Sequence, residues 1–295
     1  MNVHGLLEAW DLRPSKGLGQ NFLVDQSALE RIVAAAELAP EDVVLEVGAG
    51  LGTLTERLAR SAGSVVAVEL DQRLMPVLRD VLADLDNVTL VQGDILALDP
   101  AALVTAAGVQ DAAVSRYKVV ANLPYYITSA VLRHLLEAQP KPQRMVITVQ
   151  REVAERIVAQ PGQMSLLAVS VQFYGQPQLL FRIKPGSFYP APGVESAVVR
   201  IDLHAERLAD VVDTAAFFRV VRAGFAQRRK QLRNTLAAGL RQSPAAVAAQ
   251  LRAVGVDPRR RAQTLSLEEW ARVTRALGDG GRNTSVGGRN TSVGG

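Results

Sequence analysis

The residues best suited to chemistry lie where two apolar runs of the chain end. Asn122, Leu123, Pro124 and Tyr125 follow the run 117–121, which we interpret as a buried strand. An Asn side chain offers an amide oxygen, Pro fixes the turn and Tyr presents a flat face, so the segment suits a planar ring that carries an amino group. Upstream, residues 46–52 (EVGAGLG) end another apolar run and open a helical pattern. Together these segments predict a cofactor loop facing a base pocket, as in enzymes that methylate an amino group of a nucleobase.

The predicted cofactor loop is followed by acidic residues at the ends of the next two apolar runs. Gly48, Gly50 and Gly52 allow a tight turn in which the backbone approaches a ligand closely. Glu69 ends the second run, where an acidic residue can bind ribose hydroxyls, and Asp94 ends the third, where it can accept a hydrogen bond from an adenine amine. Three successive strand ends at one crevice form the expected ligand site of an open α/β sheet, although either carboxylate alone is equally explained as a helix cap or a surface charge.

Dinucleotide binding is the main alternative for this loop. Oxidoreductases favour GxGxxG, whereas the loop here reads GxGxG and is preceded by Glu46. The sequence also shows no pattern that resembles a hydride-transfer site. We therefore regard an oxidoreductase as a distant alternative.

The residues after the run 117–121 can orient an adenine amine. The amine nitrogen is a poor nucleophile because its lone pair is delocalised into the ring, and its hydrogens must be held by hydrogen-bond acceptors before it can attack. The Asn122 side-chain oxygen and the Leu123 carbonyl are suitable acceptors. Catalysis then comes mainly from orientation, without a strong base. Tyr125 is expected to stack on the base. Phe188 is a candidate for the other face, although packing within its loop is the preferred explanation from the residues alone.

The elements that position these residues alternate between strands and helices up to about residue 203. The expected strands are Val-rich and continuous, which is typical of a parallel sheet covered on both faces; they span 43–47, 65–70, 88–91, 118–121 and 145–149. Helical patterns lie between them, at 26–38, 51–61, 72–85 and 129–138. This rhythm predicts an α/β fold with a doubly wound sheet.

The later part of the chain changes character. Two apolar runs, 169–183 and 196–203, predict antiparallel edge strands, and the prolines of 184–195 predict a rigid, exposed connection between them. Helices are expected at 214–227, 230–240, 244–254 and 266–277. We predict one domain over 1–204, a small all-helical domain over 205–281 and a disordered tail over 282–295, where RNTSVGG occurs twice.

Composition excludes several classes of site. The chain of 295 residues contains no cysteine, so disulfides, thiolate metal sites and cysteine nucleophiles are excluded. Its three histidines are scattered, and we expect no metal. No apolar run reaches the roughly 18 residues of a membrane helix, and no secretory signal opens the chain. We expect a cytoplasmic protein that has no contact with membranes.

Positive charge is concentrated in the second part of the chain. Residues 1–184 carry a net charge of −4 and residues 185–281 carry +6. This division suits a catalytic domain with a polyanion-binding appendage, although basic residues that merely solvate helix faces would give the same count. The candidates for phosphate contacts are Arg222, Arg228, Arg229, Lys230 and Arg233. A second basic cluster, 259–261, is equally consistent with a solvated surface.

In combination, these segments resemble the ribosomal RNA adenine dimethyltransferase family, and most closely its small-subunit branch. The matching segments run in order over about 13–277: KGLGQNFL from Lys16, EVGAGLGTLT from Glu46, VELD from Val68, QGD from Gln92, NLPY from Asn122, SFYPAPGVESAVV from Ser187 and FAQRRKQLRNTL from Phe225. The last segment contains the first basic cluster, which favours RNA contact there.

The resemblance implies a Rossmann-like class I methyltransferase domain and an RNA-binding helical domain. It implies S-adenosyl-L-methionine as methyl donor, and N6 of two adjacent adenosines near the 3′ end of small-subunit (16S) ribosomal RNA as acceptor. The cofactor positions carried over to this chain are Asn21, Leu23, Gly48, Glu69, Asp94 and Asn122. Two departures stand out: Ala49 replaces a frequent Pro, and Tyr126 follows NLPY where Asn is common, which alters the surroundings of the target base.

Two functional alternatives remain within this resemblance. The sister branch methylates large-subunit RNA and confers antibiotic resistance, but Leu123 and FAQRRKQLRN favour the small-subunit branch. The chain can also act mainly as a ribosome-assembly factor that binds the immature small subunit. We expect a monomer whose partners are the small ribosomal subunit and its RNA.

Overall fold

The computed structural model describes residues 2–106, 117–205, 211 and 213–278, which belong to two units. One unit covers Met1–Val158 and Ser170–Ala205, and the other covers Ala159–Val169 and Glu206–Gly295. The predicted domain boundary at 204–205 therefore does not account for Ala159–Val169, which belong with the helical unit. The predicted tail, 282–295, lies outside the described residues.

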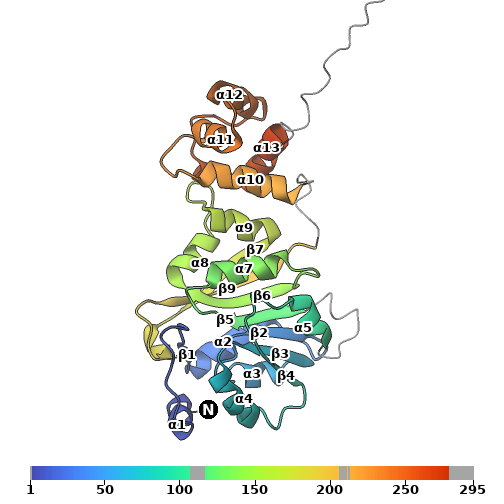
Figure 1. The fold of residues 1–295 in the computed structure, drawn as a ribbon, viewed down its shortest axis with the longest axis vertical. Helices are drawn as coiled ribbons and strands as arrows, with labels where there is room; N and C mark the ends of the chain where they lie inside the picture. The colour runs from blue at the N-terminus through green and yellow to red at the C-terminus, as the bar shows by residue number, and fades with distance from the viewer. Residues whose placement is uncertain (1, 107–116, 206–210, 212, 279–295) are drawn as a thin grey trace, which may run out of the picture. The chain divides into compact units, whose positions relative to one another are not determined.

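The first unit is built on a seven-stranded sheet (Figure 1). Its strands are β2 (Val43–Val47), β3 (Ser64–Glu69), β4 (Val88–Gln92), β5 (Lys118–Asn122), β6 (Arg144–Gln150), β7 (Gly175–Ile183) and β9 (Ser196–Leu203). Their order across the sheet is β4-β3-β2-β5-β6-β9-β7. The strands from β2 to β6 are parallel, while β9 runs antiparallel to β6 and β7. The predicted doubly wound sheet is confirmed; of the two predicted antiparallel edge strands, β7 lies at the edge and β9 lies between β6 and β7.

Helices cover both faces of this sheet (Figure 1). On one face, α2 (Gln26–Ala36), α3 (Thr55–Ala59) and α4 (Met75–Val81, which follows the short helix η1, Gln72–Leu74) pack against valines of β2, β5 and β6. Right-handed crossovers place α5 (Pro100–Ala106), α7 (Thr128–Glu137) and α8 (Arg151–Ile157) on the other face. None of the helices in the described ranges is both long and apolar enough to cross a membrane.

The order of the strands creates a switch point between β2 and β5. The chain winds outward from β2 to β4 and then returns to place β5 on the other side of β2. Val47 lies opposite Ala121 in this parallel pair, so Gly48 and Asn122 follow at neighbouring positions. A crevice at the carboxyl ends of such strands is the usual ligand site of an open α/β sheet.

The prediction of a strand across 169–183 is wrong in its first part. Helix α9 (Leu166–Tyr174) occupies these residues, and β7 begins directly after it at Gly175. Apolar residues occupy both buried positions, such as Val169 and Val171, and the exposed position Leu166, so the helical period of the run is hidden. The Ser165 hydroxyl, which accepts a hydrogen bond from the Ala168 N–H (3.1 Å), marks the helix start.

The connection at 184–195 is largely exposed, as predicted, but it carries short regular elements and one buried residue, Phe188. It contains the short helix η2 (Pro185–Ser187) and β8 (Phe188–Tyr189). Strand β8 pairs antiparallel with β1 (Phe22–Leu23), with Phe22 opposite Tyr189 and Leu23 opposite Phe188. Helix α1 (Val3–Ala9) places Val3 and Leu7 in a small core with Phe22. The N-terminal segment is thereby fixed by residues more than 160 positions away in the chain.

The second unit is helical, as predicted. It contains α10 (Thr214–Phe225), α11 (Leu232–Leu240), α12 (Pro244–Ala253), the short helix η3 (Ala262–Thr264) and α13 (Leu267–Gly278). Trp270, which is fully buried, packs so closely on α10 that a methyl group on Gly224 would lie 2.3 Å from its ring. A side chain at position 224 would therefore force these two helices apart.

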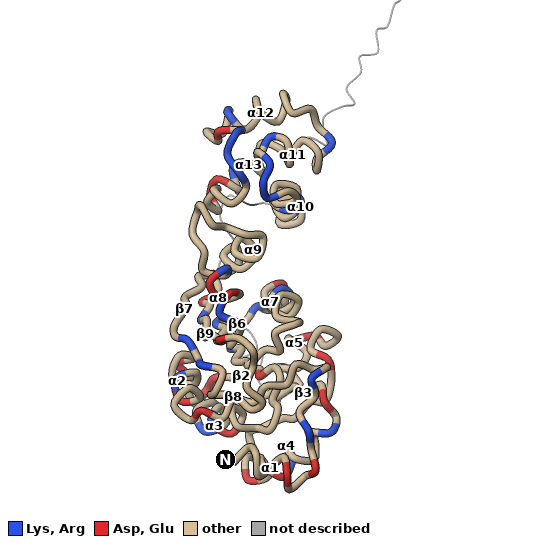
Figure 2. Tube along the Cα trace, turned by 90° about the vertical axis from the view of Figure 1, so that its left-hand side faces the viewer, with Lys and Arg blue, Asp and Glu red and all other residues tan. Residues whose placement is uncertain are grey.

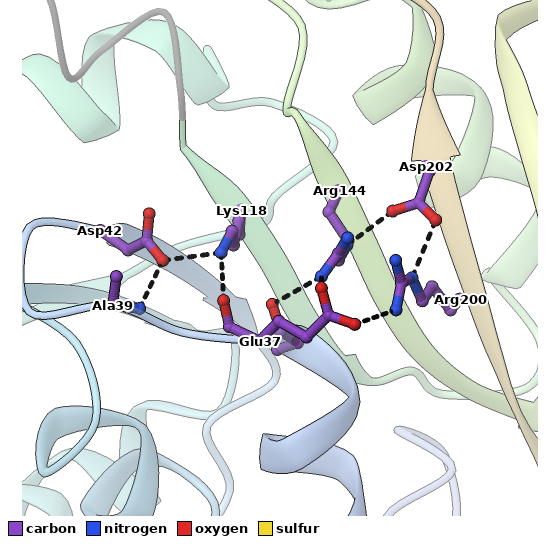
Figure 3. Close-up of polar contacts among 8 residues, drawn as sticks. Glu37, Ala39, Asp42, Lys118, Arg144, Arg200 and Asp202 are labelled. Carbon is purple, nitrogen blue, oxygen red and sulfur yellow. Dashed lines mark hydrogen bonds and ion pairs between the residues drawn. The ribbon is translucent and has the colours of Figure 1, made fainter.

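A buried ion pair fixes the sheet at the edge opposite the switch point (Figure 3). Lys118 begins β5 and is only 7% exposed. Its Nζ donates hydrogen bonds to Asp42 Oδ2 (2.7 Å) and to the carbonyl of Glu37 at the end of α2 (2.6 Å). The same Asp42 oxygen accepts the Ala39 N–H (2.7 Å). The amino end of β5 is therefore tied to the α2–β2 connection.

The carboxylate of Glu37 extends this network to two further strands (Figure 3). It pairs with Arg144 of β6 (2.6 Å) and with Arg200 of β9 (2.5 Å). Both arginines also pair with Asp202 (2.6 and 2.8 Å). Hydrogen bonds from Arg144 and Arg200 hold the pKa of Glu37 below its usual value. Alternating charges thus connect α2, β6 and β9 at one edge of the sheet.

We predict that Lys118→Met will destabilise the first unit by about 3–5 kcal/mol, because it leaves the buried Asp42 carboxylate without its cation. The matched control is Arg133→Met, which breaks an exposed pair with Glu137 and should cost at most about 1 kcal/mol. Urea denaturation followed by circular dichroism measures both changes. Equal losses in the two variants would contradict a special role for the buried pair.

Candidate active site

A pocket lies at the carboxyl ends of β2, β3, β4 and β5. It encloses about 780 Å³ including the part open to solvent, within the usual size range of small-molecule sites. Its lining combines the glycine loop, the strand ends, the N-terminal segment and the turn before α7. The lining residues are Leu18, Gly19, Gln20, Asn21, Phe22, Val47, Gly48, Gly50, Val68, Glu69, Leu70, Gly93, Asp94, Ile95, Asn122, Leu123, Pro124, Tyr125, Tyr126 and Ile127.

The glycine loop is held against β3 by its backbone. The N–H groups of Gly48 and Ala49 both donate to the Val68 carbonyl (2.9 and 3.2 Å). Gly48 and Gly50 have φ of 80° and 59°, which side chains rarely adopt. A methyl group on Gly50 would also lie 3.1 Å from the ring of Phe22. The loop therefore needs glycine both for its conformation and for the close approach of Phe22.

Glu69 bridges the glycine loop and the end of β3. Its Oε2 accepts the Gly50 N–H and its Oε1 accepts the Asp71 N–H, each at 2.8 Å. Burial raises the pKa of Glu69, while these two N–H groups favour its charged form. Each carboxylate oxygen retains a second lone pair, which can accept a ligand hydroxyl in the pocket. This geometry fits the predicted contact with a ribose.

Gln20 and Asp71 form a contact that the sequence interpretation did not include. Gln20 Nε2 donates to Asp71 Oδ2 (2.9 Å), and the Ser15 N–H donates to Gln20 Oε1 (2.7 Å). A hydrogen bond from Arg73 is the main cause that lowers the pKa of Asp71. The contact ties the N-terminal segment to the cofactor side of the pocket. Both residues lie within the recognised segments KGLGQNFL and VELD, which was the available signal.

Asn122 is oriented by the same N-terminal segment. Its Nδ2 donates to the Asn21 carbonyl (3.1 Å), and Asn21 Nδ2 donates to the Gly19 carbonyl (3.0 Å). The Leu123 N–H donates to the Thr148 carbonyl (3.2 Å). Among the described residues, no hydrogen bond uses Asn122 Oδ1 or the Leu123 carbonyl. Two acceptors are thus available at one end of the pocket.

Tyr125 lies beside these acceptors with its hydroxyl fixed. The hydroxyl is 2.6 Å from Ser196 Oγ at the start of β9. Burial raises the pKa of Tyr125, so the phenol is neutral at physiological pH. The residue is only half-buried, and it lines the pocket. An anchored, neutral ring of this kind is suited to stacking on a base.

Asp94 lies at the rim of the pocket. One of its oxygens, Oδ1, accepts the Leu96 N–H (2.9 Å) and so caps the turn after β4. Its side chain is exposed and lines the pocket, between Gly93 and Ile95. The two interpretations from the sequence, a cap and a ligand contact, are therefore compatible, because Oδ2 is left for a ligand amine.

Most of the predicted site residues meet at this pocket. Asn21, Gly48, Gly50, Glu69, Asp94, Asn122, Leu123, Pro124 and Tyr125 all line it. Leu23 and Phe188 do not line it, since they are paired on β1 and β8 and are 3% and 4% exposed. Phe22, which was not predicted, takes a place in the lining instead. Alternation along β1 explains this exchange, because neighbouring side chains of a strand point to opposite faces.

The charges of the pocket favour a cationic ligand. Glu69 and Asp94 contribute carboxyl groups, while none of the described residues in its lining is Lys, Arg or His. The sulfonium and ammonium groups of S-adenosyl-L-methionine suit such a lining. Val68, Leu70 and Ile95 add apolar walls for its adenine ring.

The predicted RNA-contact residues belong to the second unit (Figure 2). Arg228, Arg229 and Lys230 are exposed in the turn between α10 and α11 rather than on a helix. No ion pair among the described residues engages these three side chains. Arg222 is exposed near the end of α10. Arg233 differs, since it is half-buried and its Nε lies inside the unit without a hydrogen-bond partner there.

The second basic cluster, 259–261, is largely engaged within the unit. Arg259 pairs with Asp257 (3.2 Å), and Arg260 binds both oxygens of Glu269. The carbonyls of this loop also accept the first N–H groups of α11, since Leu232 donates to Arg260 (2.7 Å). Arg260 is therefore structural, whereas Arg259 forms an exposed surface pair.

Glu46 is a further buried acid that the prediction of the site left out. It lies in β2, is 1% exposed and lines a small cavity beneath the glycine loop together with Thr53, Leu54 and Asn122. Its Oε2 has no hydrogen-bond partner among the described residues. Burial, reinforced by the charge of Glu69, raises the pKa of Glu46 to about 8. An acid in the middle of the apolar run VVLEV was the available signal.

Comparison with known proteins assigns a family to this arrangement. Residues 13–279 match the family model described as ribosomal RNA adenine dimethylase. The chain belongs to this family. A dimethylase needs a methyl donor, so the predictions of a methyltransferase and of S-adenosyl-L-methionine as its cofactor are confirmed, and the oxidoreductase alternative is wrong.

Individual relatives of this dimethylase are similar over most of their length. The chain is 48% identical to a protein of Dehalococcoides mccartyi named ribosomal RNA small subunit methyltransferase A, over 90% of this chain and 89% of that one. It is 30% identical to the crystal structure of the 23S rRNA methyltransferase ErmE, with a TM-score of 0.68 over 87% of this chain and 99% of that one. A dimethyladenosine transferase of Plasmodium falciparum shares the fold at 21% identity, with a TM-score of 0.72 over 85% and 95% of the two chains.

We predict that the stability of this dimethylase falls as the pH rises from about 4.5 to 8 and that Glu46→Gln weakens this dependence. The folded protein holds the Glu46 proton through that window, because its pKa is raised from 4.5 to about 8, whereas the unfolded chain has lost it. One proton corresponds to at most about 1.4 kcal/mol per pH unit.

Urea denaturation at pH 5.5 and 8 measures this effect. The control is Glu30→Gln, which removes an exposed carboxyl of α2 and should leave the pH dependence unchanged. An unaltered slope in Glu46→Gln would show that Glu46 is ionised in the folded protein.

Proposed function

We propose that this protein transfers methyl groups from S-adenosyl-L-methionine to N6 of two adjacent adenosines near the 3′ end of small-subunit ribosomal RNA, giving N6,N6-dimethyladenosines. The observation that carries the proposal is the orientation of Asn122. Its amide nitrogen donates to the Asn21 carbonyl, so Oδ1 remains as an acceptor for an exocyclic amine in the pocket that Leu123 also lines.

The site residues have separate tasks in this transfer. Bound S-adenosyl-L-methionine supplies a methyl group on a positively charged sulfur. Asn122 Oδ1 and the Leu123 carbonyl hold the N6 hydrogens of the adenine, so that the lone pair of the nitrogen points at the methyl group. Tyr125 stacks on the base while Ser196 fixes its ring. Since its phenol is neutral, Tyr125 takes no proton, and the proton leaves to solvent after transfer.

The cofactor has its own set of contacts in the proposal. Glu69 binds the ribose hydroxyls, and Asp94 accepts from the adenine amine of the cofactor. The backbone of Gly48 and Gly50 and the side chain of Asn21 surround its methionine part. These roles are supported by the common lining of one acidic pocket and by the free lone pairs of the two carboxylates.

The small-subunit substrate is supported by the relatives. Identity is 48% to a protein named for the small subunit and 30% to one named for 23S RNA. The second similarity keeps methylation of large-subunit RNA as an alternative. A role mainly in ribosome assembly is compatible with either substrate.

Partner, location and oligomeric state follow from the same proposal. The partner is the small ribosomal subunit, and the protein acts in the cytoplasm, where its RNA substrate is found. We propose that it works as a monomer, because every residue assigned to the transfer comes from one chain. Arg222, Arg228, Arg229 and Lys230 contact RNA phosphates, and Arg233 is the least exposed member of this group.

The proposal is tested by transfer of a tritiated methyl group to small subunits that lack the modification, with large subunits and naked RNA as controls. Dimethyladenosine in small subunits only is the expected product. Label in large-subunit RNA would instead assign the protein to the branch that confers antibiotic resistance. Binding of small subunits without methyl transfer would favour a role as an assembly factor.

In this assay Asn122→Ala is expected to lower kcat by about 100-fold or more, because the amine loses one of two acceptors in a site that works by preorganisation. Thermal unfolding of the variant, together with its binding of small subunits, distinguishes this loss from misfolding. Retained activity in a folded Asn122→Ala protein would refute the role of this residue.

The contribution of the basic turn is tested by the triple variant Arg228→Ala, Arg229→Ala and Lys230→Ala. We expect weaker binding of small subunits and a salt dependence whose slope falls by about 2–3 between 50 and 200 mM salt, since up to three phosphate contacts are lost. Arg259→Ala, which removes a side chain paired with Asp257, is the matched control. Equal effects of the two proteins would contradict the assignment.

A further inference from the structure

Tyr126 is the most exposed large hydrophobic side chain in the described part of the chain, although it lines the active-site pocket. It is 58% exposed, whereas its neighbour Tyr125 is half-buried with an anchored hydroxyl. The chain thus places one tyrosine inside the pocket and the next at its mouth. The transfer described above assigns no task to the second ring.

The two tyrosines point differently because they share a turn. The Ile127 N–H donates to the Pro124 carbonyl (3.3 Å), which makes Tyr125 and Tyr126 the two central residues of a four-residue turn. Thr128 Oγ1 donates to the same carbonyl (3.3 Å) and ties the turn to the start of α7. Side chains at the centre of such a turn leave it on diverging paths.

The ring of Tyr126 is supported by the N-terminal segment. A methyl group on Gly19 would lie 3.2 Å from its Cδ1 and 3.4 Å from its Cε1, so the backbone of Gly19 packs closely against the ring. Gly19 itself has φ of 61° and lies in a turn in which its N–H donates to the Lys16 carbonyl (3.1 Å). The ring is therefore held from one side while more than half of the residue stays open to solvent.

We propose that Tyr126 stacks on the nucleobase next to the adenine that occupies the pocket, and so acts as a positioning residue for the RNA strand. This inference rests on the proposed function. Tyr126 is exposed at the mouth of the pocket, where the strand that carries the bound adenine must pass, so the neighbouring base can stack on its ring. A flat aromatic face can stack on any of the four bases, so it needs no hydrogen bonds to the neighbouring base.

If Tyr126 stacks on RNA, removing its ring should weaken RNA binding and leave cofactor binding unchanged. Removing the aromatic ring by Tyr126→Leu should weaken binding of unmodified small subunits by about 5- to 30-fold, the equivalent of one lost stack. Tyr126→Phe keeps the face and should bind like the unchanged protein. The affinity for S-adenosyl-L-methionine should be the same in all three proteins, because the ring lies outside the contacts assigned to the cofactor.

The experiment measures the dissociation constant for small subunits, the dissociation constant for S-adenosyl-L-methionine and the rate of methyl transfer. Trp10→Leu is the matched control, since Trp10 is an exposed aromatic residue (39%) that does not line the pocket. Unchanged subunit binding in Tyr126→Leu overturns the inference, as does weaker binding of S-adenosyl-L-methionine, which would assign the ring to the cofactor. If the unchanged protein transfers no methyl group to small subunits, the proposed function itself fails.

Discussion

The parallel pairing of β2 with β5 is the constraint on which the site depends. Because Val47 lies opposite Ala121, the glycine loop that follows one strand and the Asn122 turn that follows the other are neighbours. No side chain has to reach across the molecule to join the cofactor and the base. The charged network at the other edge, from Lys118 to Asp202, fixes the amino ends of the same sheet. The network therefore holds the strands in place at one end of the sheet, which helps to keep the pocket residues in position at the other end.

The strands and the strand-end residues of the site were predictable from the sequence. Continuous Val-rich runs predicted the bounds of β2 and β9 as the structure has them, and Glu69, Asp94 and Asn122 lie at strand ends as expected. These features are local, since they depend on apolar runs and on where the runs end. Helix α9 was missed because its residues are apolar almost throughout, which hides its helical period.

The contacts of the N-terminal segment were not predictable in this way. Asn21 meets Asn122 across 101 residues of chain, and β1 finds its partner in β8. A two-residue strand is too short to show an alternation of apolar and polar residues. The sequence of Phe22–Leu23 therefore does not indicate which side chain faces the pocket. The family resemblance placed Asn21 at the pocket correctly. It also placed Leu23 there, whereas the structure has Phe22 in the lining. Long-range pairing decides such details, and local pattern does not.

The pairing of β1 with β8 also has a consequence for the order of events during synthesis. The chain leaves the ribosome from its N-terminus, so the glycine loop and the Asn122 turn emerge well before Phe188 and Tyr189. Until then Phe22 and Leu23 have no partner strand, and the segment that orients Asn122 is held only by its contacts with earlier parts of the chain, such as Gln20 with Asp71. A nascent chain therefore completes its catalytic pocket only after nearly two-thirds of the protein has been made, so partly made chains lack a finished site.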